Sequence, residues 1–181
     1  MTVQETNLKG CFIIQPTVFE DKRGYFLESF NREKFNTAIG EDITFVQDNE
    51  SFSTKGVLRG LHYQIGEHAQ AKLVRVIKGR VLDIAVDIRP DSPTYGQHVA
   101  VELSEENKTQ FFVPRGFAHG FVVLSDTAIF SYKCDNFYNK ASEGGIIYND
   151  PSLNINWQLP EEQLIISEKD AILPILENAL I

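Results

Sequence analysis

The chain has few cysteines and no long apolar run. Its two cysteines, Cys11 and Cys134, have no metal-binding spacing and are too few for a disulfide framework. We therefore expect free thiols in a reducing compartment. No apolar run approaches the roughly 18 residues that a membrane span needs, and no charged-then-apolar signal precedes Leu8. The sequence predicts a soluble, cytoplasmic protein that is not associated with a membrane.

Basic residues are also scarce, and the net charge of −8 argues against a nucleic-acid partner, whose phosphates need a basic face. A phosphorylated small molecule stays compatible, because a pocket can hold a few arginines and lysines on an acidic surface. We find no internal repeat, no low-complexity tract and no Gly-x-Gly-x-x-Gly segment to hold a nicotinamide. The hydrophobic content of 43% and the length of 181 residues predict one globular domain over residues 1–181.

Short β-rich runs separated by turn signals make up most of the chain. They cover residues 10–15, 16–19, 25–30, 43–48, 57–64, 71–78, 79–88, 98–103, 110–113, 117–124 and 128–135. One helix is expected between Asn31, as its N-cap, and Gly40, and a short helical segment from Ser167. This pattern predicts an all-β fold, a double-sheet jelly roll, with a few short helices mainly near the C-terminus. Such a barrel can hold a small ligand in its mouth.

An arginine and a histidine lie three residues apart in the apolar run from Val57 to Gln64. The pattern suggests that Arg59 presents a guanidinium to an anion and that His62 presents an imidazole to a proton. The plainer alternative is a strand in which His62 is a hydrogen-bonded core residue. This stretch alone does not decide between the two.

The segment from Pro114 to Gly120 contains Pro-x-Gly-x-x-His, a motif of the cupin superfamily in which the histidine points into the barrel. Metal-binding cupins also have a partner motif that contains two histidines separated by one residue. In this chain His62 matches the first of them, and Gln64, a poor ligand for a transition metal, stands at the second. Only His62 and His119 are expected to point inward, too few for a metal site. We therefore predict a cupin-like β-barrel without a metal, with a purely structural His119 as the alternative.

Two further residues could serve such a histidine. Lys72 lies ten residues after His62, a distance that a hairpin folds back, and could stabilise an oxyanion. Tyr132 could donate a proton from the opposite side. The ordinary alternatives are a solvated charge at a strand end for Lys72 and half-buried packing for Tyr132.

Nearly the whole chain resembles the dTDP-4-dehydrorhamnose 3,5-epimerase family. The resemblance is carried by blocks in the same order, at residues 21–28, 47–51, 58–64, 70–74, 114–121, 132–133, 138, 143–145 and 167–170. It implies epimerisation of a dTDP-4-keto-6-deoxyglucose at C3 and C5 in the dTDP-L-rhamnose pathway, with no cofactor and no metal. It also implies a homodimer formed through an exchanged N-terminal strand, for which we expect the run from Cys11 to Ile14 to provide an edge.

The resemblance also implies roles for single residues. His62 would be the base at C3 and C5, Asp170 the carboxylate that orients it, Lys72 the residue that stabilises the enolate oxygen at C4, and Tyr132 the acid. The positions that match substrate-binding residues of the family are Arg23, Glu28, Gln47, Asn49, Arg59, Lys72, His119, Glu143 and Lys169, and Phe26 and Tyr138 are candidates for packing against thymine.

Three alternatives stay open at this point. The first is a related epimerase that inverts only C3, since the sequence does not determine how many centres invert. The second is a 3,4-ketoisomerase on the same barrel. It is disfavoured because the block at residues 58–64 follows the epimerase pattern, and so does Asp170. The third is a sugar-binding module without catalysis.

Overall fold

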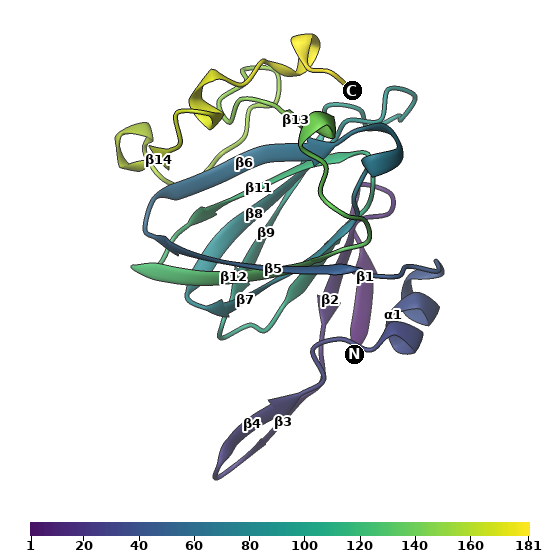
Figure 1. Ribbon diagram of the computed structural model, residues 1–181. Coiled ribbons are helices and arrows are strands. Elements are labelled where there is room, and N and C mark those ends of the chain that lie inside the picture. The colour runs from purple at the N-terminus through teal and green to yellow at the C-terminus, as the bar shows by residue number, and fades with distance from the viewer.

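Two six-stranded sheets face each other in the computed structural model, which describes all 181 residues (Figure 1). The first sheet has the order β1 (Thr2–Glu5), β2 (Phe12–Gln15), β10 (Gln110–Val113), β7 (Lys72–Lys78), β12 (Thr127–Cys134) and β5 (Gln47–Thr54). The second has the order β13 (Glu143–Gly145), β6 (Val57–Gln64), β11 (Phe117–Val123), β8 (Arg80–Asp87) and β9 (His98–Ser104), with β14 (Ile165–Ile166) beside β6. The predicted jelly roll is confirmed.

The core lies between the two sheets and a second apolar layer lies outside the second sheet. Inward-facing residues of both sheets, among them Val74, Val81, Phe111 and Phe130, form one buried cluster. The C-terminal third covers the outer face of the second sheet, where Trp157 is buried in one cluster with apolar residues of β6 and β8. Strand β8 is therefore buried on both faces, which accounts for its nearly continuous apolar sequence.

Helix α1 (Arg32–Ile39) covers part of the outer face of the first sheet. Asn31 caps it by accepting a hydrogen bond from the Lys34 N–H, and Gly40 ends it with a φ of 76°. Phe35 is buried in one apolar cluster with Leu73 and Phe112 of the sheet. The predicted helix is confirmed, and no helix in the structure is long and apolar enough to cross a membrane.

Strands β3 (Val18–Asp21) and β4 (Gly24–Leu27) form a separate hairpin that projects away from the sandwich (Figure 1). It exposes three large rings, since Phe19 is 61% exposed, Tyr25 55% and Phe26 69%. An isolated two-stranded hairpin is marginally stable in water. This ribbon therefore lacks, within its own chain, the surface that would bury its aromatic side chains.

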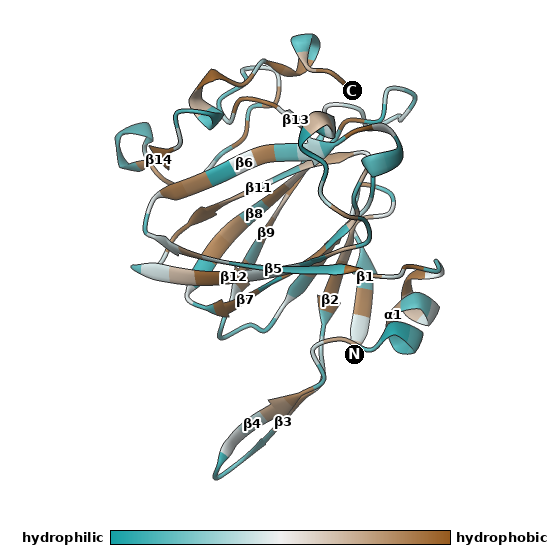
Figure 2. Cartoon of the chain, in the orientation of Figure 1, coloured by the Kyte–Doolittle hydropathy of each residue, from teal (hydrophilic) through white to brown (hydrophobic).

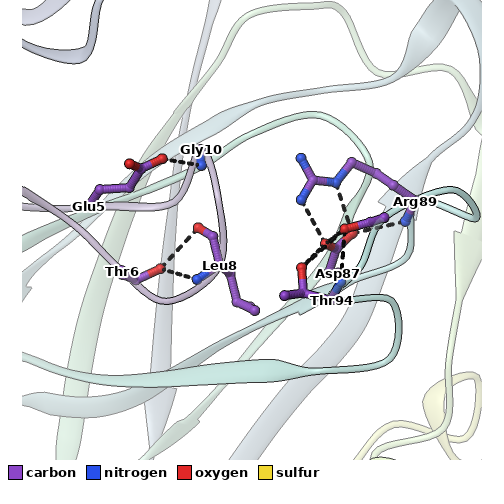
Figure 3. A network of polar contacts seen from close by, with 8 residues as sticks. Glu5, Thr6, Leu8, Gly10, Asp87, Arg89 and Thr94 are labelled. Atoms are coloured by element: carbon purple, nitrogen blue, oxygen red, sulfur yellow. Dashed lines mark hydrogen bonds and ion pairs between the residues drawn. The ribbon is translucent and has the colours of Figure 1, made fainter.

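A polar network anchors the loop that follows β8. The Asp87 carboxylate accepts hydrogen bonds from Arg89, Ser92 and Thr94 (Figure 3). Burial alone would raise the pKa of Asp87, but these donors hold the pKa well below its ordinary value. The Arg89 guanidinium also lies over the Phe117 ring, 4.6 Å from its centroid. The network fixes the ends of β8 and β11, the strands that carry Asp83 and His119.

Three details differ from the sequence predictions. Strand β5 begins at Gln47, so that most of it lies beyond the predicted run of residues 43–48. The segment from Ser167 forms only a single 3₁₀ turn, Asp170–Ile172. The expected edge at Cys11 to Ile14 is wrong, because β2 is flanked by β1 and β10 and Cys11 is fully buried. The free edge of this sheet belongs to β1, whose polar sequence gave no strand signal.

Candidate active site

A cavity of about 590 Å³ lies between the two sheets. Residues of β5 and β6 line it, two strands that are consecutive in the chain but belong to different sheets. Its walls include Asn49, Ser51, Arg59, His62, Lys72, His119, Tyr132, Lys169 and Asp170. A smaller cavity of about 310 Å³ adjoins it, shares Asn49, His62, Lys72 and Tyr132, and adds Gln47, Tyr138 and Glu143. The larger volume is in the range of pockets that bind small ligands. Eleven of the predicted site residues therefore line two adjoining cavities.

His62 forms a short polar contact with a carboxylate in the cavity wall. Its Nε2 lies 2.7 Å from Oδ1 of Asp170, a residue brought in from the C-terminal 3₁₀ turn. Burial alone would raise the pKa of Asp170, but hydrogen bonds from His62, the Gly60 N–H and Ser167 lower it below its ordinary value. An ionised Asp170 accepts the Nε2 hydrogen and leaves the lone pair on Nδ1. His62 therefore has the tautomer of a general base.

A second histidine–aspartate pair lies beside the first. Nε2 of His119 lies 2.9 Å and 3.0 Å from the two carboxylate oxygens of Asp83, whose side chain is fully buried. Asp83 was missed from the sequence because it lies inside the apolar run of β8. A charge flanked by apolar residues on both sides was the available signal, since a carboxylate enters a core only with a partner.

Lys72 and Tyr132 face the histidines from the first sheet. The carboxylates nearest to Lys72 are paired elsewhere, Asp83 with His119 and Glu143 with Lys169, so the amine has no ion-pair partner. Burial lowers the pKa of the Lys72 ammonium and raises the pKa of the Tyr132 hydroxyl. The cavity thus holds a base on one wall and a cation and a phenol on the other.

Strand β5 turns a row of polar side chains toward the interior. Gln47, Asn49, Ser51 and Ser53 are partly or fully buried, whereas the residues between them are exposed. Figure 2 shows β5 as hydrophilic over most of its length, in contrast to the apolar β8 and β11. Ser53 accepts a hydrogen bond from Nε of Arg59 at 3.2 Å. A polar inner face on a strand is expected where it lines a binding site rather than the core.

Three residues form an ionic cluster at the rim of the smaller cavity. Glu143 accepts hydrogen bonds from Lys169 at 2.6 Å and from the Tyr138 hydroxyl at 3.0 Å. Burial would raise the pKa of Glu143, but these two partners hold it below its ordinary value. The cluster orients Tyr138, which is 53% exposed, beside the opening.

Three predicted substrate-binding residues lie outside the two cavities around His62. Arg23 is at the turn of the β3–β4 hairpin, where it is exposed and paired with Asp21. Phe26 is on the same hairpin, and Glu28 follows it and binds Lys34. Neither cavity around His62 includes any of them.

The structure brings together no group of three or more His, Cys, Asp or Glu side chains that could hold a metal ion. Cys11 and Cys134 are free and buried.

Two glycines let β6 and β11 approach each other beside the histidines. A Cβ added to Gly120 would lie 2.7 Å from the Arg59 carbonyl oxygen and 3.0 Å from Cα of Gly60. Because backbone atoms cannot move aside without shifting a strand, Gly120→Ala is expected to lower the free energy of unfolding by about 1–3 kcal/mol. Urea denaturation measures this, and an unchanged midpoint would contradict the close approach.

The chain matches the family model described as dTDP-4-dehydrorhamnose 3,5-epimerase over residues 5–178. A curated dTDP-4-dehydrorhamnose 3,5-epimerase from Salmonella typhimurium is 53% identical over 184 residues, which cover 100% of this chain and 98% of that protein. The crystal structure of a dTDP-6-deoxy-D-glucose-3,5-epimerase from Legionella pneumophila, in complex with dTDP-4-keto-L-rhamnose, is 50% identical with a TM-score of 0.94, covering 98% of this chain and 93% of that one.

A more distant solved structure has a different specificity. A 3′-monoepimerase from Streptomyces bikiniensis, in complex with dTDP-quinovose, is 32% identical with a TM-score of 0.88, covering 95% of this chain and 86% of that one. The fold is therefore shared by enzymes that invert different numbers of centres.

Proposed function

The chain belongs to the dTDP-4-dehydrorhamnose 3,5-epimerase family, and we propose that its barrel cavity inverts C3 and C5 of dTDP-4-dehydro-6-deoxy-D-glucose through an enolate. The enzyme is thus an isomerase that acts on a dTDP-linked sugar and yields dTDP-4-dehydro-L-rhamnose. The observation that carries the proposed mechanism is the His62–Asp170 pair, which faces Lys72 and Tyr132 across one cavity.

His62 removes the proton at each centre. The protons on C3 and C5 are both α to the C4 ketone, so one base can act on both once the sugar ring presents each in turn. The 2.7 Å contact to Asp170 supports this role, because a carboxylate on Nε2 fixes the tautomer and stabilises the imidazolium that forms.

Lys72 stabilises the enolate oxygen at C4. A carbon acid next to a ketone is too weak for imidazole unless the developing oxyanion is stabilised, and one preorganised donor supplies on the order of 3 kcal/mol. The absence of an ion-pair partner for Lys72 supports the assignment, since its ammonium is available to the substrate.

Tyr132 returns a proton to the opposite face. It comes from the first sheet, whereas His62 comes from the second, so the two groups approach a sugar ring between the sheets from opposite sides. Inversion at carbon requires this arrangement, because the same face would regenerate the original centre. The raised pKa of Tyr132 keeps the phenol protonated and able to donate.

Nucleotide recognition is assigned to the residues around the opening. Arg59 and Lys169 suit the diphosphate, because both supply charge-assisted donors. Tyr138, held by Glu143, suits stacking against the thymine ring. The amides of Gln47 and Asn49 on β5 offer hydrogen bonds to the nucleoside.

The active enzyme is proposed to be a homodimer in which each hairpin serves the other subunit. Arg23 and Phe26 match substrate-binding positions of the family but lie on a ribbon that projects from its own barrel (Figure 1). A second copy would bury the exposed rings of this ribbon and receive its arginine at the diphosphate. That arrangement gives the aromatic side chains of the hairpin a surface to pack against and places the Arg23 guanidinium in the active site of the other subunit.

Complementation between two defective variants tests the shared site. Arg23→Ala is expected to lower kcat/KM by about 10- to 100-fold, the effect of losing one charge-assisted hydrogen bond. Equal mixtures of Arg23→Ala and His62→Asn chains, refolded together, are expected to recover about a quarter of wild-type activity, because half the dimers are mixed and one of their two sites is intact.

Mixtures of His62→Asn with Lys72→Met are the matched control, since both defects lie in the barrel and no intact site can form. If the Arg23 mixture is no more active than its components, the hairpin serves its own subunit or no dimer forms.

The runner-up functions are a C3-only epimerase and a sugar-binding module. Incubation with dTDP-4-dehydro-6-deoxy-D-glucose, followed by proton NMR of the product, separates them by the ring coupling constants. Inversion at both centres is the expected result. Inversion at C3 alone would favour the monoepimerase, and an unchanged sugar that binds would favour the module.

A further inference from the structure

Two histidine–aspartate pairs lie side by side in the cavity wall. His62 on β6 and His119 on β11 are directly opposed in the antiparallel register. Each binds its carboxylate through Nε2, and in each ring Nδ1 makes no hydrogen bond within the protein. The pairs differ in burial. The side chains of His62 and Asp170 are 30% and 6% exposed, and those of His119 and Asp83 are 7% and 0% exposed.

The number of protons in such a pair decides what Nδ1 can do. With one proton, Nε2–H donates to the carboxylate, the pair has a net charge of −1, and Nδ1 is a bare acceptor. With two protons the pair is neutral. The ring then carries hydrogen on Nδ1 whether the second proton lies on Nε2 or on the carboxyl oxygen. Net charge therefore determines whether Nδ1 accepts or donates.

The surroundings favour different states in the two pairs. Asp83 has no hydrogen-bond partner except His119, and burial raises the pKa of its carboxyl group. A net charge is costly in such a site, so the neutral, two-proton state is favoured. Asp170 accepts further hydrogen bonds that lower its pKa. The one-proton state, with a bare Nδ1, is favoured for His62.

The titratable groups that line the cavities beside the buried pair include His62 on β6, Lys72 on β7, Tyr132 and Cys134 on β12, Glu143 on β13, and Asp170 on the C-terminal 3₁₀ turn. The Lys72 ammonium opposes a second proton on the pair. Its effect is limited, because it forms no ion pair with Asp83. Glu143 is paired with Lys169.

We propose that Asp83 is a positioning residue that keeps a hydrogen on Nδ1 of His119, so that this ring donates to the C4 oxygen as the enolate forms. The inference rests on the proposed function, since only an oxyanion in the cavity makes use of this donor. The same side-chain pairing thus yields a base at His62 and a donor at His119, because burial changes the net charge.

The first test is the protonation of the two rings in wild-type enzyme. In protein labelled with ¹⁵N-histidine at neutral pH, Nδ1 of His119 is expected to give the signal of a protonated nitrogen, and Nδ1 of His62 that of a bare one. A bare Nδ1 on His119 would overturn the proposal, and this measurement needs no variant that folds.

The second test is Asp83→Asn, which can neither share a carboxyl proton nor balance an imidazolium. Solvent exchange at C3 and at C5 is expected to slow by a similar factor of about 10², because the C4 oxygen is common to both deprotonations. The Kd for dTDP is expected to stay within about twofold, since the nucleotide contacts lie elsewhere. The matched control is Asp150→Asn, a comparably buried carboxylate outside the cavity, whose exchange rates are expected to be unchanged.

Wild-type exchange rates in Asp83→Asn, or slowing at one centre only, would overturn the assignment. Absence of exchange in the wild-type enzyme would instead refute the proposed function itself, so the two failures are distinguishable.

Discussion

The His62→Asn variant is expected to turn over about 10²- to 10⁴-fold more slowly than the wild type, the contribution typical of a well-placed general base. Asparagine keeps a polar side chain of similar length beside Asp170 but cannot accept a carbon-bound proton. Solvent exchange at C3 and C5 should fall together with turnover, because one base serves both centres. The Kd for dTDP is expected to stay close to the wild-type value.

Turnover followed by NMR and dTDP binding followed by calorimetry measure the two effects separately. His98→Asn is the matched control, because His98 lies half-buried on β9 and lines neither cavity. Exchange that persists at the wild-type rate in His62→Asn would remove His62 from the mechanism. Equal losses of turnover and dTDP affinity would make it a binding residue only.

Asp170→Asn is expected to lower kcat by about 10³-fold while leaving dTDP binding intact. The amide can hold either tautomer of His62 and has no charge to stabilise the imidazolium, a loss that is large in histidine–aspartate catalysis generally. Because Asp170 also accepts the Gly60 N–H at 3.4 Å, a modest loss of stability is expected as well.

The control for the loss of a carboxylate charge is Asp126→Asn, in an exposed turn. Thermal melts of both variants separate stability from catalysis. A kcat for Asp170→Asn within a few-fold of the wild type would show that His62 needs no orienting carboxylate. The proposal that an aspartate sets the role of each histidine in the cavity would then fail as well.

Most of the sandwich could be predicted from the sequence, because its strands either alternate apolar and polar residues or are continuously apolar where they are buried on both faces. Strands β6 and β10 have the predicted bounds, and α1 lies between its predicted caps. Strand β5 was placed too early for the opposite reason. Its inner face is polar, so apolar periodicity fails where the strand lines the cavity instead of the core.

The candidate site shows the same limit. The resemblance pointed to His62, Lys72, Tyr132 and Asp170, and the structure brings all four to one cavity. Asp83 was missed because a charge within the apolar run of β8 indicates that the residue has a partner but does not indicate which residue the partner is. The position of Arg23 could not be predicted either, because a hairpin that leaves its own barrel gives no local signal.

The central claim is that His62 takes the protons of C3 and C5 and that solvent replaces them. The most direct test is conversion of dTDP-4-dehydro-6-deoxy-D-glucose in D₂O, with the product examined by NMR and mass spectrometry. The account predicts deuterium at both C3 and C5 in wild-type product and at neither in His62→Asn. Inverted product without deuterium at either centre would contradict it.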